Sequence, residues 1–189
     1  MTPQETVLAL TRHIREAVRP HLGAWHGREI TGTAASGDAT FRIDEHAEEA
    51  IVSFIERERL SIAYYSEDKG LIEFGASPEA VLIIDPIDGT RPAVAGFEQC
   101  VVSVAWADYR PDVTLADVRL GCIGEIKNDD LFWAERGRGR TGSGRTAGNA
   151  RRACCPSQTS AARRCPSKWS PGPSRGSGPP WPRSWTQAR

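Results

Sequence analysis

The sequence predicts an α+β fold, with helices packed on a sheet and a disordered tail after them. Three observations support this prediction. Two helical patterns occur early in the chain, strand-like apolar runs follow, and the composition then changes abruptly. Helices that precede a strand-rich half argue for α+β layers. The length of 189 residues and the 39% hydrophobic content suit one soluble domain or a little more, with its own core.

The first two elements are expected to be amphipathic helices. One is expected at about residues 4–19, closed by Pro20, because its apolar residues fall near helical spacing: Val7, Leu8, Ile14 and Val18. The segment DEHAEEAIVSFIERERL contains a clearer stripe, with apolar residues recurring every three or four positions. Acidic residues occupy its first turn and arginines its last turn, as the helix dipole favours. Asp44 is expected to open this second helix.

Strands are expected after the second helix. SIAYYSEDKG indicates a short strand that enters a polar loop, and VLIID indicates a buried strand that ends at Asp85. CVVSVAWAD, VRLGCIGEI and LFWAE have the lengths and the β-branched or aromatic content of three more strands. Polar, turn-like runs separate them. We find no internal repeat.

The tail differs chemically from the rest of the chain. Residues 141–189 hold nine Lys or Arg, no Asp or Glu, and no Leu, Ile, Val, Phe, Met or Tyr. Ordering a chain costs at least roughly 1 kcal/mol per residue, which three buried tryptophans cannot offset. We therefore expect one domain at 1–140 and a disordered, basic, Pro/Ser/Gly/Arg-rich tail at 141–189. This composition is typical of a high-G+C gene read in the wrong frame, so we interpret the tail as a frameshift product.

Several classes of protein are not expected. Charges interrupt the amino-terminal segment, and no apolar run reaches membrane-spanning length, which favours a cytoplasmic protein without a membrane partner. Cys100 and Cys122 lie in apolar runs and are expected in the core. Cys154, Cys155 and Cys165 have no histidine nearby, which disfavours a zinc site. The basic tail permits contact with nucleic acid, but its scattered arginines and few aromatic residues make that the weaker interpretation.

The segment VLIIDPIDGTRP indicates a site. An apolar strand delivers Asp85 and Asp88, Pro86 fixes the backbone between them, and Gly89 and Thr90 leave room for an anion at a helix start. Two carboxylates about 4 Å apart repel by roughly 4 kcal/mol at an effective dielectric near 20, so they should hold a proton or a cation. Oxygen ligands without adjacent His or Cys favour magnesium over zinc. Alternatively, Asp88 only caps a helix and Asp85 ends a strand in solvent.

These residues resemble the inositol monophosphatase family of metal-dependent phosphomonoesterases. IIDPIDGT is similar to the central signature of that family, and YYSED to its acidic strand-end motif. GDATFRIDEHAEEAI and GCIGEIKNDDLFWAERGRG are similar to the segments that precede and follow. The resemblance covers roughly residues 4–139. It implies the amino-terminal helix-on-sheet half of a layered αβαβα sugar-phosphatase fold.

The resemblance also implies roles for residues. Glu67, Asp85 and Asp88, with the backbone carbonyl of Ile87, would hold Mg²⁺. Asp88, Gly89 and Thr90 would bind the substrate phosphate. The catalytic residues implied for activating water are three: Glu67, Thr90 and Asp44. Two alternatives stay open at this stage, because Glu67 and Asp68 could form an exposed loop and Asp44 could be only a helix cap.

The implied function is hydrolysis of a phosphomonoester by a magnesium-dependent enzyme, with a small phosphorylated substrate as partner and a homodimer allowed. Inositol phosphate, fructose bisphosphate and a phosphorylated nucleoside all remain candidate substrates. Arg91 stands where the family often has a small or polar residue, and it could contact a second anionic group or be solvated. No motif of the family's second half is found, so we expect low activity from this chain. The alternative is an inactive, truncated protein that binds metal or a partner.

Overall fold

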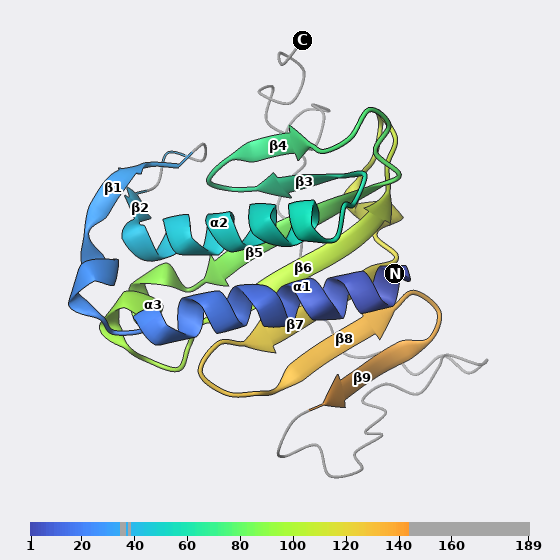
Figure 1. The fold of residues 1–189 in the computed structure, drawn as a ribbon. Helices are drawn as coiled ribbons and strands as arrows, with labels where there is room; N and C mark the ends of the chain where they lie inside the picture. The colour runs from blue at the N-terminus through green and yellow to red at the C-terminus, as the bar shows by residue number, and fades with distance from the viewer. Residues whose placement is uncertain (35–36, 38, 144–189) are drawn as a thin grey trace, which may run out of the picture. The chain divides into compact units, whose positions relative to one another are not determined.

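Two helices lie across one face of a seven-stranded sheet (Figure 1). The structure is a computed structural model that describes residues 1–34, 37 and 39–143. All of these residues belong to one compact unit. The helices are α1 (Pro3–Val18), α2 (Arg42–Arg57) and the short α3 (Thr90–Ala95), with 3₁₀ turns at Arg19–His21, Trp25–Arg28 and Leu115–Asp117.

The sheet has the strand order β4-β3-β5-β6-β7-β8-β9. Its strands are β3 (Ile62–Ser66), β4 (Gly70–Glu73), β5 (Ala80–Asp88), β6 (Val101–Asp108), β7 (Leu120–Glu125), β8 (Leu131–Glu135) and β9 (Gly139–Ser143). Neighbours pair antiparallel except β3 and β5, which pair parallel. A separate two-stranded ribbon joins β1 (Ile30–Thr33) to β2 (Ala39–Phe41) just before α2. The predicted α+β fold is confirmed.

The first helix agrees with its prediction, whereas the start of the second was placed two residues late. α1 begins with a capping box, in which Thr2 and Glu5 exchange hydrogen bonds between side chain and backbone. α2 begins at Arg42 rather than at Asp44. The Asp44 carboxylate reaches back and accepts the Phe41 N–H at 2.8 Å, so Asp44 caps the helix from inside its first turn.

All five predicted strands are present. The described residues contain four further strands, and one predicted boundary is wrong. β5 does not end at Asp85; it continues to Asp88, with an irregularity in its pairing to β6 between those two residues. β1, β2, β4 and β9 were not predicted, because three of them have only three or four residues and β9, GRTGS, contains no large apolar residue.

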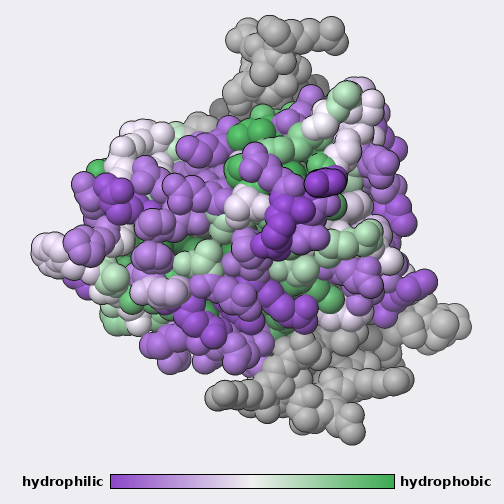
Figure 2. Space-filling view, in the orientation of Figure 1, coloured by the Kyte–Doolittle hydropathy of each residue, from purple (hydrophilic) through white to green (hydrophobic). Residues whose placement is uncertain are grey.

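The core lies between the sheet and α1 and α2. One row of fully or almost fully buried side chains comes from the two helices and another from the central strands: Val7, Leu10, Ile14, Ile51, Phe54, Leu82, Ile84, Val102 and Val104. Cys100 and Cys122 are buried and free, as the apolar runs predicted. The outward face of the helices is largely polar (Figure 2). No helix in the described ranges is long and apolar enough to cross a membrane.

The opposite face of the sheet is also partly apolar. Ala63, Val81 and Ala107 form a small buried cluster there. The side chains of Ile123 and Phe132 are 46% and 51% exposed. Residues 144–189 lie outside the described residues, and so do Cys154, Cys155 and Cys165. The prediction of a disordered tail therefore stays a prediction, although Thr141, Gly142 and Ser143 pair with β8 as part of β9.

The link between β5 and α3 depends on Gly89. Its φ of 96° lies in the left-handed region. A Cβ at this position would stand 2.5 Å from the backbone oxygen of Gln99. Only glycine fits both constraints, so Gly89 fixes the path of the chain at the end of the strand.

Gly89→Ala is expected to lower the free energy of unfolding by more than Gly137→Ala does. Gly137 has a similar φ of 79°, but a Cβ added there would meet no atom within 4 Å, so alanine brings only the backbone penalty of roughly 1–2 kcal/mol. Gly89→Ala adds an overpacking penalty of about 1–3 kcal/mol. Urea unfolding of the two variants measures the difference. Equal losses would show that the loop of Gln99 yields without cost.

Candidate functional site

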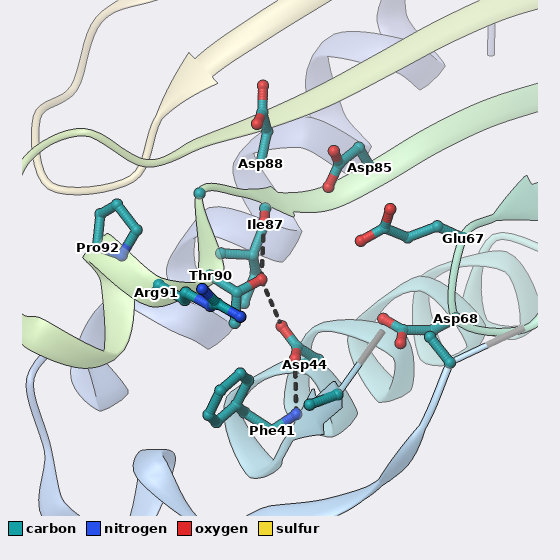
Figure 3. Close-up of a pocket in the computed structure, with 13 residues that line it drawn as sticks. Phe41, Asp44, Glu67, Asp68, Asp85, Ile87, Asp88, Thr90, Arg91 and Pro92 are labelled. Carbon is teal, nitrogen blue, oxygen red and sulfur yellow. Dashed lines mark hydrogen bonds between the residues drawn. The ribbon is translucent and has the colours of Figure 1, made fainter. Parts of the chain in front are cut away.

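One pocket brings five acidic residues together (Figure 3). Its volume is about 380 Å³, and it opens where β3 and β5 end, beside the first turn of α2. Because β3 and β5 run parallel, their carboxyl ends meet at the same edge of the sheet. The lining residues are Ala34, Ala39, Phe41, Asp44, Glu67, Asp68, Asp85, Ile87, Asp88, Gly89, Thr90, Arg91 and Pro92.

All seven residues implied by the family resemblance line this pocket: Asp44, Glu67, Asp85, Ile87, Asp88, Gly89 and Thr90. They come from segments as far apart as α2 and α3, so the tertiary fold brings them together. Their location agrees with the prediction, and their roles stay predictions. Glu67 and Asp68 do lie in a turn, in which Glu67 is exposed and Asp68 is half-buried, and both line the pocket. The exposed turn of the alternative interpretation is therefore part of the pocket wall.

Asp44 and Thr90 form the best-defined contact. Asp44 is only 5% exposed, and the Thr90 hydroxyl lies 3.1 Å from its Oδ1 atom. The same hydroxyl lies 3.1 Å from the carbonyl oxygen of Ile87. A hydroxyl carries one proton, so it donates to only one of these two acceptors at a time. Asp44 is therefore more than a helix cap: it also contacts the residue that begins α3.

Two carboxyl groups in the pocket have raised pKa values. Burial, opposed by the hydrogen bond from the Phe41 N–H, raises the pKa of Asp44 to about 6. Burial and then the negative charges of Glu67 and Asp88 raise the pKa of Asp85 to about 6. Neighbouring carboxylates contribute to both shifts. Full ionisation of these carboxyl groups is therefore unfavourable in the folded protein near neutral pH.

Asp68 was not assigned a role from the sequence. It is half-buried, lines the pocket and accepts a hydrogen bond from the Thr40 hydroxyl at 3.0 Å. Its charge also raises the pKa of Asp44 and, less strongly, of Asp85. The signal in the sequence was the second acid of YYSED, but a contact across 28 residues cannot be found from spacing.

The chemistry of the donor set fits a divalent cation. Five carboxylates and one backbone carbonyl offer hard oxygen atoms, which magnesium prefers. In Figure 3 the carboxylates of Glu67 and Asp85 point toward the same space, whereas that of Asp88 points away from them. Among the residues that the structure describes, no three such side chains already stand close enough together to hold a metal ion. A site that used Asp88 as a third ligand would require its side chain to turn inward.

Comparison with known proteins identifies the family of this chain. A model of the inositol monophosphatase family matches residues 4–171, most of the chain. The chain belongs to the inositol monophosphatase family. A curated relative from Methanothermobacter thermautotrophicus, named fructose-1,6-bisphosphatase/inositol-1-monophosphatase, is 31% identical over 136 residues, which cover 69% of this chain and 49% of the relative. The Nus factor SuhB of Vibrio cholerae is 36% identical over 109 residues, covering 58% of this chain and 38% of SuhB.

Solved structures show the same fold. A crystal structure described as an inositol monophosphatase–fructose 1,6-bisphosphatase superposes with a TM-score of 0.62 at 23% identity, covering 75% of this chain and 52% of that chain. At this identity the likeness concerns the fold alone. The present chain spans about half the length of that protein and of its curated relative from Methanothermobacter.

In metal-free protein, Asp85→Asn is expected to stabilise the fold near pH 7 and to change its stability little near pH 4. The pKa of Asp85 rises from 3.8 to about 6 in the folded state, so the unfolded chain releases this proton first as pH rises. Stability therefore falls between about pH 4 and pH 6, by roughly 1.4 kcal/mol per unit of pKa difference. Asparagine has no ionisable proton, so the stability of the variant does not fall in this way over the same pH range.

Urea unfolding with a chelator at both pH values measures this effect. Asp112→Asn is the matched control, because Asp112 is an exposed acid outside the pocket. If Asp85→Asn shifted stability equally at both pH values, crowding of charge in the pocket would not be the cause.

Proposed function

We propose that this chain binds magnesium and a small phosphomonoester in the pocket and that its residues activate water for hydrolysis of the phosphate. The observation that carries the proposal is the gathering of five carboxylates and Thr90 around one pocket. Burial, and after it the neighbouring negative charges, raise the pKa values of Asp44 and Asp85 to about 6, and a cation would offset both effects. Membership of the family, and the phosphatase names of relatives, support the same conclusion.

The residues that would hold magnesium are Glu67, Asp85 and Asp88, with the carbonyl oxygen of Ile87. Bound magnesium supplies polarisation of the phosphoryl oxygens and stabilisation of the leaving alkoxide. Gly89 lets the phosphate approach the backbone, because it has no side chain in the way. Asp88 and Thr90 flank that position and would orient the phosphate.

The contact between Thr90 and Asp44 suits proton transfer from water. As the attacking water loses a proton to Thr90 Oγ1, the hydroxyl proton of Thr90 passes to Asp44 Oδ1, 3.1 Å away. The water oxygen then forms the bond to phosphorus while the bond from phosphorus to the leaving oxygen breaks. A pKa of about 6 makes Asp44 an effective proton acceptor near neutral pH. Glu67 would orient the water from the other side of the pocket.

Inositol phosphate is the first candidate substrate, and one observation favours a substrate with two anionic groups. Arg91 is the one cationic side chain among the residues that line the pocket. No hydrogen bond or ion pair joins it to another residue in the described part of the chain, although five carboxylates surround the same pocket. A second phosphate on the substrate would pair with its guanidinium. A fructose bisphosphatase or bisphosphate nucleotidase specificity is therefore the second candidate.

Magnesium is expected to bind the wild-type chain, and Asp88→Asn is expected to weaken this binding about tenfold or more, because one anionic ligand is lost. Isothermal titration calorimetry with Mg²⁺ measures both affinities, and Asp112→Asn again serves as control. Hydrolysis of inositol monophosphate by the same samples, with and without Mg²⁺, tests turnover. Equal Mg²⁺ affinity of the wild type and Asp88→Asn would remove Asp88 from the site. Tight Mg²⁺ binding without any hydrolysis would favour the inactive, metal-binding alternative.

Arg91→Gln is expected to lower kcat/KM about tenfold for fructose bisphosphate or adenosine 3′,5′-bisphosphate and to leave that for inositol monophosphate nearly unchanged. A charge-assisted hydrogen bond contributes about 1.5–3 kcal/mol, and about 1.4 kcal/mol corresponds to tenfold. Steady-state assays with Mg²⁺ compare the substrates, and Arg91→Lys, which keeps the charge, is the matched variant. Equal losses for the monophosphate and the bisphosphates would assign Arg91 no part in specificity.

The cytoplasmic location and the homodimer also stay predictions.

A further inference from the structure

Helix α2 buries two carboxyl groups, and the pocket uses only one of them. Asp44 is 5% exposed and Glu48 is 4% exposed, and they are the two buried acids among the described residues. Four residues apart on a helix, they project from the same face, one turn from each other. Asp44 contacts Thr90 at the pocket. Glu48 lines no part of that pocket, so its burial needs a separate explanation.

Glu48 contacts the inner side of strand β3. The Tyr64 hydroxyl donates a hydrogen bond to Glu48 Oε2 at 3.1 Å, and both residues are buried. Burial raises the pKa of Glu48, while the nearby hydroxyls of Ser66 and Tyr64 lower it. The other carboxylate oxygen, Oε1, is buried without a hydrogen-bond partner within the part of the chain that the structure describes. Tyr64 and Ser66 alternate with Tyr65 along β3 and therefore face the same side of the sheet. Glu48 is thus hydrogen-bonded to Tyr64, which precedes Ser66 on the inward face of β3.

Ser66 connects this contact to the acidic turn. Its hydroxyl oxygen accepts the N–H of Lys69 at 3.2 Å, and its backbone pairs with Gly70 on β4. Glu67 and Asp68 lie in the sequence between Ser66 and these two partners. The Ser66 side chain therefore lies near Glu48 on the inner face of β3 and closes the turn that carries both pocket acids.

We propose that Glu48 is a positioning residue that, through Tyr64 and Ser66, holds the end of β3 so that Glu67 and Asp68 face Asp85. The inference rests on the proposed function, because it assumes that Glu67 contributes to the metal site. Residues that orient metal ligands from behind typically change metal affinity by 10–100-fold when they are removed.

An ordinary core role explains Glu48 less well. Burying a carboxyl group between a helix and a sheet costs free energy unless it is hydrogen-bonded, and an apolar residue of similar size would often be neutral or stabilising there. Its neighbours on the buried face of α2 are apolar: Ala47, Ile51, Phe54 and Ile55. Unlike an apolar side chain, the carboxyl group forms a directional hydrogen bond to the strand near its end.

The experiment measures Mg²⁺ affinity by calorimetry, together with the free energy of unfolding, for variants of the full chain. Glu48→Ala and Tyr64→Phe are expected to weaken Mg²⁺ binding about tenfold or more. Glu48→Gln is expected to stay within about threefold of wild type, because the amide oxygen can still accept the hydrogen bond from Tyr64. Phe54→Leu is the control for a general loss of stability, since Phe54 packs near His13 of α1, away from the turn of Glu67. It is expected to destabilise the fold without changing Mg²⁺ affinity.

Each outcome decides the inference. Wild-type affinity in folded Glu48→Ala and Tyr64→Phe would overturn it, and so would an equal loss of affinity in Phe54→Leu. If Glu48→Ala does not fold, Tyr64→Phe, which removes one hydroxyl and leaves no large cavity, decides alone. Glu67→Gln distinguishes a failure of the positioning role from a failure of the proposed metal site. Should it weaken binding while the Glu48 and Tyr64 variants do not, only the positioning role fails; should it bind as wild type, the proposed metal site fails as well.

Discussion

The parallel pairing of β3 with β5 is the interaction on which the site depends. The register sets Ile62 opposite Ala80 and Tyr65 opposite Ile83, a constant offset of 18 positions. Continued for two residues beyond Tyr65, past the end of β3 at Ser66, the same register would set Glu67 opposite Asp85. The charge of Glu67 is accordingly the first of the neighbouring charges that raise the pKa of Asp85. A slip of one residue in this pairing would turn one of the two carboxylates away from the other.

Burial and crowding of the pocket acids lower the stability of the metal-free fold near neutral pH. Asp44 and Asp85 both have pKa values raised to about 6, so their ionised forms are disfavoured in the folded state. The surrounding structure tolerates this because α1, α2 and the central strands share a continuous apolar core on the other side of β5. The helix layer thus provides the stability that the acidic pocket lacks.

Helix α2 links that core to the pocket. Its apolar face packs on the sheet, and its two buried acids reach the two halves of the site separately. Asp44 contacts the start of α3 through Thr90, whereas Glu48 contacts the end of β3 through Tyr64. A single rigid helix can therefore keep the distance between Thr90 and the acidic turn constant, as the proposed hydrolysis of a phosphate would require.

The sequence by itself determined the local features of this protein. The run from Asp85 to Thr90 is contiguous, so its acids, its glycine and its helix start could be predicted from neighbouring residues. The helical stripes and the five longer apolar strands follow from periodicity in the same way. Only the tertiary structure decided that Asp68 joins the site through Thr40 and that Glu48 reaches Tyr64. Such contacts depend on strand register and on the seating of α2 against the sheet, which are set by packing over the whole core and leave no trace in local spacing.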